Sequence, residues 1–231
     1  MHLFIANKLY SSWSLRPWML MTALGIPFEE TVIPMYFPDS KARMLDVSPT
    51  GKMPCLVQGD TKIWESLAIC EYLHEAFPNK GVWPSDPKAR AHARSVASEM
   101  HAGFQALRSA CPMNLGKRFA SRDDLGSDVA DNVRRLEGLW ADARVRFGEK
   151  ASPAGPFLYG AFSAADAMFA PVVTRLDTYQ TRVSPAARRY MDQILAHPAF
   201  LSWRSQALAE PWTVAHYEAG WTPVETFRQT I

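Results

Sequence analysis

Residues 6–27 read "ANKLYSSWSLRPWMLMTALGIP", and this stretch decides which fold we expect for the first part of the chain. The apolar run at 3–6 predicts a short buried strand, and the apolar stretch at 14–24 predicts a helix. Ser14 is expected to cap that helix, Pro17 falls in its first turn, and Gly25 ends it. The turn between strand and helix therefore carries serines, at 11, 12 and 14, where a nucleotide-binding loop would carry glycines.

A helix start gives these hydroxyls a possible chemical role. Free N–H groups and the helix dipole favour negative charge there. A serine hydroxyl in that place can hold a bound thiolate through an O–H···S⁻ hydrogen bond. Capping alone remains the simpler alternative, but it needs one serine and the turn has three.

The remaining pattern predicts an α/β domain over 1–78, a proline-rich linker over 79–87 and an all-helical domain over 88–231. The first domain continues with a strand, a short helix, a hairpin and a helix capped by Ser66, at 28–35, 39–47, 55–65 and 66–77. The helices of the last domain are expected at about 88–110, 125–149, 164–178, 185–196 and 199–209. "SAAD" at 163–166 predicts a capping box with a structural role.

The composition narrows the function classes. A net charge of +2 on 231 residues gives no warrant for a nucleic-acid partner. No apolar run is long enough for a membrane span or a signal peptide, so we expect a soluble, cytoplasmic protein. Cys55, Cys70 and Cys111 are far apart, which favours buried free thiols in a reducing compartment. The histidines show no ligand spacing, and no metal site is expected.

Two short motifs suit an amino-acid or peptide ligand. Walker A would need a glycine where Asp46 stands, so "SPTGKMP" at 48–54 is not a phosphate loop. A cis bond between Met53 and Pro54 would leave the Met53 backbone groups free to pair with a peptide, and an ordinary trans strand start is the alternative. At the next helix start, Glu65 can meet an ammonium group and Ser66 a carboxylate.

The order of these motifs resembles the cytosolic glutathione S-transferases over essentially the whole chain. The resemblance implies a thioredoxin-like N-terminal domain, an all-α C-terminal helical domain, glutathione as co-substrate, a small electrophile as second substrate, and a homodimer. "SSWSLRPW" is similar to the serine-type, zeta- and theta-like classes. Trp13 stands where the zeta pattern has cysteine, and this departure weighs against the isomerase activity of zeta members.

The resemblance also implies roles for single residues. Ser11 would hydrogen-bond the glutathione sulfur, with Ser12 as the alternative. The positions that match the family's glutathione site are Lys52, Met53, Pro54 as the cis-proline, Glu65 and Ser66. The electrophile pocket is expected between the domains, lined by Trp13, Met100, His101, Phe104 and Arg108. For these pocket residues a plain interhelical core is an equal alternative.

Two other functions stay open. One is a glutathione-dependent isomerase of the maleylacetoacetate type, acting on unsaturated diacids, for which Arg175 is a possible additional cation. The other is a protein that binds glutathione or apolar ligands without catalysis. Retention of Ser11 and Ser12 argues against this last alternative.

Overall fold

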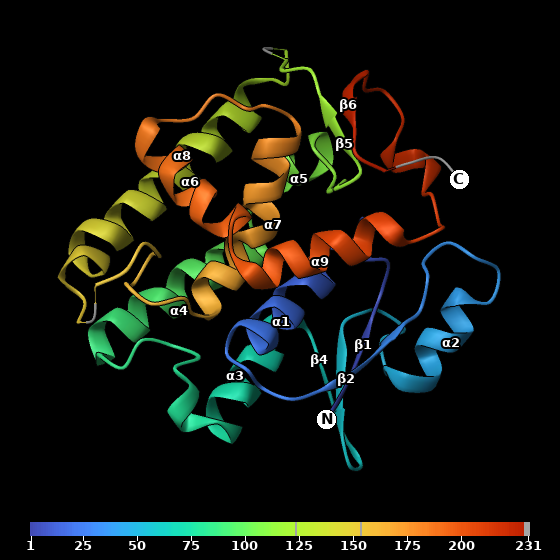
Figure 1. Ribbon diagram of the computed structural model, residues 1–231, viewed down its shortest axis with the longest axis horizontal. Coiled ribbons are helices and arrows are strands. Elements are labelled where there is room, and N and C mark those ends of the chain that lie inside the picture. The colour runs from blue at the N-terminus through green and yellow to red at the C-terminus, as the bar shows by residue number, and fades with distance from the viewer. Residues whose placement is uncertain (123, 153, 229–231) are drawn as a thin grey trace.

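The computed structural model describes residues 1–122, 124–152 and 154–228. A four-stranded mixed sheet of order β2-β1-β3-β4 forms the N-terminal part (Figure 1). Its strands are β1 (His2–Ile5), β2 (Glu29–Val32), β3 (Cys55–Gln58) and β4 (Thr61–Trp64). β1 runs parallel to β2 and antiparallel to β3, with Leu3 opposite Glu30 on one side and Leu56 on the other. β3 and β4 form the expected hairpin.

Strand alternation divides the sheet between two cores. Leu3 and Ile5 point into the main core, which includes residues of α1 (Ser12–Ala23) and α3 (Ser66–Ala76). Cys55 points the other way, where Met44 of α2 (Ser40–Val47) covers a smaller core. The Met53–Pro54 bond is cis, as expected.

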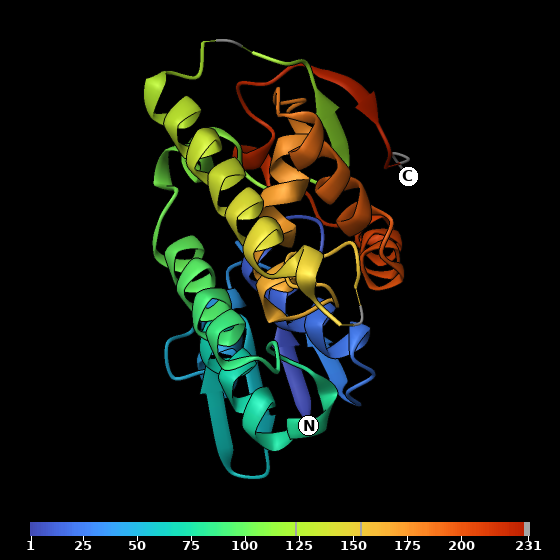
Figure 2. The same ribbon diagram turned by 90° about the vertical axis from the view of Figure 1, so that its left-hand side faces the viewer.

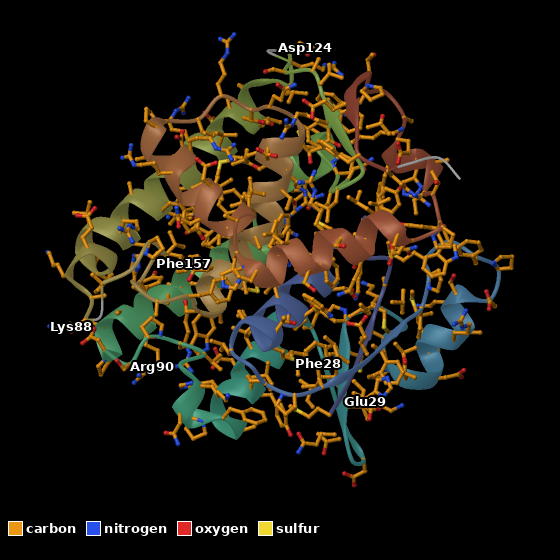
Figure 3. The ribbon with its side chains drawn as sticks, in the orientation of Figure 1. Phe28, Glu29, Lys88, Arg90, Asp124 and Phe157 are labelled. Carbon is orange, nitrogen blue, oxygen red and sulfur yellow. The ribbon has the colours of Figure 1, made fainter. Side chains whose placement is uncertain are left out.

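Helices make up most of the second part, and Figure 2 shows them stacked above the sheet. They are α4 (Pro87–Ala102), α5 (Gln105–Ala110), α6 (Ser127–Arg146), α7 (Ala164–Thr178), α8 (Pro185–Leu195) and α9 (Pro198–Ala209), with short 3₁₀ turns η1 (Pro78–Lys80), η2 (Gly148–Lys150) and η3 (Ala215–Tyr217). α7 is the central helix, and all of its residues except Asp177 are buried. It packs on both α1 and α4. In Figure 3, Phe28 and Glu29 mark the sheet end of the molecule and Asp124 marks the opposite end.

The helical part departs from the sequence expectation in two places. The helix predicted over 88–110 is two helices, α4 and α5, separated at Gly103 and Phe104. Gly103 is the C-cap of α4, where a Cβ would lie 2.8 Å from the Glu99 carbonyl oxygen. The helix ends there because the next residue, Phe104, has a positive φ of 62°. A small antiparallel pair, β5 (Lys117–Phe119) and β6 (Pro223–Thr226), also joins segments far apart in the chain.

The helix caps are partly as expected. The Ser163–Asp166 box is confirmed, since the Asp166 carboxylate accepts the Ser163 N–H at 3.0 Å. The cap expected at Ser14 is wrong, because the helix starts earlier and Ser11 is the N-cap. The cap expected at Ser66 is wrong as well: Glu65, with φ of 68°, holds the N-cap position of α3, and Ser66 is the first helical residue.

Candidate active site

The turn that carries Ser11, Ser12 and Ser14, here called the serine turn, links β1 to α1 through hydrogen bonds. The Ser11 hydroxyl accepts the Ser14 N–H at 3.3 Å and donates to the Ser14 Oγ at 2.8 Å. Ser14 Oγ also accepts the N–H of Ala6 at 3.0 Å, so Ser14 ties the end of the strand to the helix. Ser12 is bound differently, since its Oγ accepts from Arg175 Nη2 of α7 at 3.3 Å. The two hydroxyls singled out from the sequence therefore have different partners.

The last helix anchors this turn from behind. The carboxylate of Glu210, just after α9, accepts the backbone N–H of Lys8 at 2.7 Å and of Leu9 at 3.1 Å. Burial raises the pKa of Glu210, while these two donors oppose the rise. Because both halves of the chain supply the contacts, the position of the serine turn depends on how they pack.

A cleft of about 380 Å³ opens beside α1. Its lining comes from the turn before β3, the start of α3 and the end of α4: Trp13, Thr50, Lys52, Met53, Pro54, Glu65, His101 and Ala102. The structure thus brings together four of the five residues predicted to bind glutathione. Thr50 and Ala102 carry no chemical signal in the sequence, and only the fold places them here.

The predicted glutathione residues offer the groups that a tripeptide needs. Lys52 is exposed and supplies a cation, while Glu65 is exposed and supplies an anion. Among the described residues, Met53 takes part in no backbone–backbone hydrogen bond, so its N–H and C=O are available at the cleft. Ser66 lies deeper than expected: it is fully buried, and its hydroxyl points to the Met168 sulfur at 3.9 Å.

The predicted electrophile residues divide into two groups. Trp13 and His101 line the cleft and stack edge to face with ring centroids 5.1 Å apart. Met100 is fully buried, and Phe104 is nearly so. Burial lowers the pKa of His101, and Arg16 lowers it further, while Glu65, whose carboxylate lies 3.7 Å from Nε2, opposes the change. Burial and Arg16 thus favour the neutral imidazole of His101.

Arginines gather behind the cleft. The guanidinium carbons of Arg16 and Arg108 lie 4.0 Å and 4.7 Å from the Trp13 ring centroid. Arg16 is fully buried, and burial together with Arg108 and Arg175 holds its pKa well below the ordinary value. Burial, with Arg108, lowers the pKa of Arg175 to about 10, so this side chain stays charged at neutral pH. Arg108 donates to the carbonyl oxygens of Met100 and His101.

The C-terminal segment packs against Tyr10, the residue before Ser11. Tyr217 lies against Tyr10 with ring centroids 5.7 Å apart, and its hydroxyl is 3.2 Å from that of Tyr36. Glu218 accepts from the Tyr10 hydroxyl at 2.7 Å. Trp221 packs elsewhere, against Tyr179. Tyr217 and Glu218 thus hold the C-terminal segment beside the start of the serine turn.

Other chemistry is poorly supported by the described part of the chain. The three cysteines are free and buried, as expected, and burial raises the pKa of both Cys70 and Cys111 to about 12. They are therefore poor nucleophiles. Across residues 1–122, 124–152 and 154–228, no group of three or more His, Cys, Asp and Glu could hold a metal ion. In the same ranges no helix has the length and apolar character of a membrane span.

Comparison with known proteins decides the family. A model described as glutathione S-transferase, N-terminal domain, matches residues 10–76. The maleylacetoacetate isomerase of Pseudomonas aeruginosa is 30% identical over 162 residues, which cover 68% of this chain and 72% of that protein. This chain belongs to the glutathione S-transferase family.

Two further matches concern part of the sequence and the fold. A probable maleylacetoacetate isomerase of Caenorhabditis elegans is 35% identical over 103 residues, covering 43% of this chain and about half, 48%, of that protein. The structure of a sphingomonad glutathione S-transferase complexed with glutathione has the same fold, with a TM-score of 0.63. It is 21% identical and covers 90% of this chain and 98% of its own.

Proposed function

We propose that the protein is a glutathione transferase that activates the thiol of glutathione for attack on a soft electrophile. The observation that carries this proposal is the Ser11 hydroxyl at the N-cap of α1, the helix whose Trp13 lines a cleft together with Lys52, Met53 and Glu65. Family membership supports the same reaction class.

The cleft residues are proposed to hold glutathione by its polar ends. Glu65 receives the ammonium group, and the N–H groups at the start of α3 receive the neighbouring carboxylate, since a helix N-terminus favours an anion. The Met53 backbone pairs with the central cysteine as a neighbouring strand would. Lys52 faces the remaining carboxylate. This arrangement directs the sulfur toward Ser11 and Ser12.

Activation is needed because the thiolate is the nucleophile. With an ordinary thiol pKa near ~8.5, only a few per cent is ionised at neutral pH. In the proposed mechanism the thiol proton leaves to solvent and the Ser11 hydroxyl turns from Ser14 to donate to the sulfur. The sulfur lone pair then forms a bond to the electrophilic carbon, and the leaving group departs with its electron pair. Trp13 and His101 border the space for the electrophile.

The test measures conjugation of glutathione to a chlorinated nitroaromatic, together with the ultraviolet absorbance of bound thiolate against pH. Ser11→Ala should raise the thiol pKa and slow the reaction by about one to three powers of ten, the usual cost of losing one charge-stabilising donor. Glutathione affinity should change little. Ser95→Ala, on the exposed face of α4, is the matched control. A wild-type protein that binds glutathione with an unperturbed thiol would contradict the proposal.

A second candidate is a glutathione-dependent isomerase of unsaturated diacids. The arginines behind the cleft favour it, because they offer positive charge for a carboxylate. Two relatives carry this activity in their names. In this reaction the thiolate adds to a carbon–carbon double bond and leaves again, so glutathione is not consumed. Isomerisation of a maleyl-type acid without loss of thiol would support it, and net conjugation would favour the transferase. Binding of glutathione with neither reaction would favour the non-catalytic alternative.

A further inference from the structure

Arg175 makes the link between the helical half and the serine turn. Its Nη2 donates to Ser12 Oγ at 3.3 Å, its Nε to the Cys111 carbonyl at 2.9 Å, and its Nη1 to the Pro171 carbonyl at 3.3 Å. All of these acceptors are neutral. The contact to Ser12 is the only one of the three that crosses from α7 to α1.

The surrounding charge is unbalanced. Within the described ranges, no carboxylate lies at salt-bridge distance from Arg16, Arg108 or Arg175. Arg16 Nη1 is also buried without a hydrogen-bond partner in those ranges. The groups that face Arg175 and Arg16 are Arg108 on α5, Cys111, Tyr179, Tyr217, Cys70 and Glu65. Of these groups, Glu65 is the one carboxylate, and its charge raises the pKa of Arg16 against the larger effect of burial. An anion at the serine turn would therefore meet an excess of positive charge.

The Ser12 hydroxyl has a proton with which it can donate a hydrogen bond to such an anion. Because its oxygen accepts from Arg175, its single proton is free to point elsewhere, and no described residue accepts it. Ser11 differs, since its proton is bound by Ser14. A glutathione sulfur that accepts the Ser12 proton would lie about 4–6 Å from the Arg175 guanidinium. Over that distance a cation lowers the pKa of an acid by about 1–3 units.

We propose that Arg175, acting through Ser12, is a positioning residue that keeps bound glutathione in its thiolate form. This inference rests on the proposed function and adds a residue from the helical half to it. The guanidinium orients the Ser12 hydroxyl toward the sulfur and contributes a positive charge behind it. The thiol proton leaves to solvent, and no bond to Arg175 or Ser12 is formed. Thiol activation then requires the two halves of the chain to be packed together.

The experiment titrates the thiolate absorbance of protein-bound glutathione in the absence of electrophile. Arg175→Gln should raise the thiol pKa by about one unit. Arg175→Lys keeps the charge, so its rise in thiol pKa should be no more than half as large. Ser12→Ala should raise it by a similar amount. In Ser12→Ala/Arg175→Gln the two effects should not add, because residues that act through one contact are coupled. Arg134→Gln, an exposed arginine on α6, is the matched control and should leave the thiol unchanged.

The outcomes separate this inference from the proposed function. A wild-type thiol with an ordinary pKa would overturn both. A lowered wild-type pKa that is unchanged in folded Arg175→Gln would overturn the inference alone. Strictly additive effects of the two substitutions would overturn the route through Ser12. A higher KM for an anionic electrophile with no change in thiol pKa would assign Arg175 to substrate binding instead. If Arg175→Gln does not fold, Ser12→Ala and Arg175→Lys decide the question in the same titration.

Discussion

At the scale of single residues, Ser14 joins β1 to α1 by hydrogen bonds that could not be predicted from its place in the sequence. It was expected to cap α1, but the cap is Ser11, and Ser14 Oγ accepts from both Ala6 N–H and Ser11 Oγ. Ser14 is fully buried, so these contacts have no water to replace them. The spacing Ser-x-x-Ser could be read from the sequence, whereas the direction of each hydroxyl could not, because it depends on where β1 ends relative to α1.

Ser14→Ala leaves the Ala6 N–H unpaired in the interior and should lower the free energy of unfolding by about 1–3 kcal/mol. It should not raise the thiol pKa, because the Ser11 proton is then released from its partner. Urea denaturation and the thiolate titration measure the two effects, with Ser95→Ala as a surface control expected within ~0.5 kcal/mol of wild type. A raised thiol pKa in Ser14→Ala would contradict this account.

At the scale of elements, α7 begins at a buried acid. Asp166 accepts the N–H groups of Leu158 at 3.1 Å and Ser163 at 3.0 Å, and the Tyr190 hydroxyl at 3.2 Å. Burial raises its pKa from the ordinary 3.8 to about 6, although these donors oppose the rise. The capping box that starts α7 therefore ties three segments together, which the sequence pattern of the box alone does not indicate.

A pH dependence follows from that shift. The pKa of Asp166 is higher in the folded protein than in the unfolded chain. Between about pH 4 and pH 6 this carboxyl group is therefore deprotonated in the unfolded chain and still protonated in the folded protein. The stability of the fold should then fall as pH rises through this window, by up to ~3 kcal/mol from this group, and stay level above it. Asp166→Asn cannot ionise, so the difference in unfolding free energy between the two proteins should change across the window. A difference that does not vary with pH, measured by urea denaturation, would refute this.

At the scale of the whole molecule, we predict a homodimer. Tyr36, Phe37, Leu45 and Trp64 of the α/β half are between 42% and 64% exposed, as are Val145, Leu201 and Val224 of the helical half. A second chain would cover some of these apolar side chains. Sedimentation at micromolar concentration should give about twice the 25.9 kDa of one chain. Sedimentation at the mass of one chain over the same concentration range would overturn the prediction. Cytoplasmic location likewise stays a prediction, to be checked by cell fractionation.

Most elements and their order could be predicted from the sequence, apart from the division between α4 and α5 and the β5–β6 pair. Hydrophobic periodicity, the glycine after α1 and the motif at 163–166 are local signals, and the helices they predicted lie within one or two residues of those observed for α7, α8 and α9. The order of the serine, Met-Pro and Glu-Ser motifs also pointed to the family. Each of these signals depends on neighbours within a few positions in the chain.

Which of these segments contact one another depends on the tertiary structure alone. The helix breaks at Gly103 and Phe104, where Phe104 has a positive φ, and β5 pairs with a strand more than a hundred residues away. The Ser66 hydroxyl points to the Met168 sulfur of α7, and Arg175 donates to Ser12 across 163 positions of sequence. Packing of α7 against α1 sets the contact between Arg175 and Ser12, and no periodicity within either helix encodes the partner that the other helix presents.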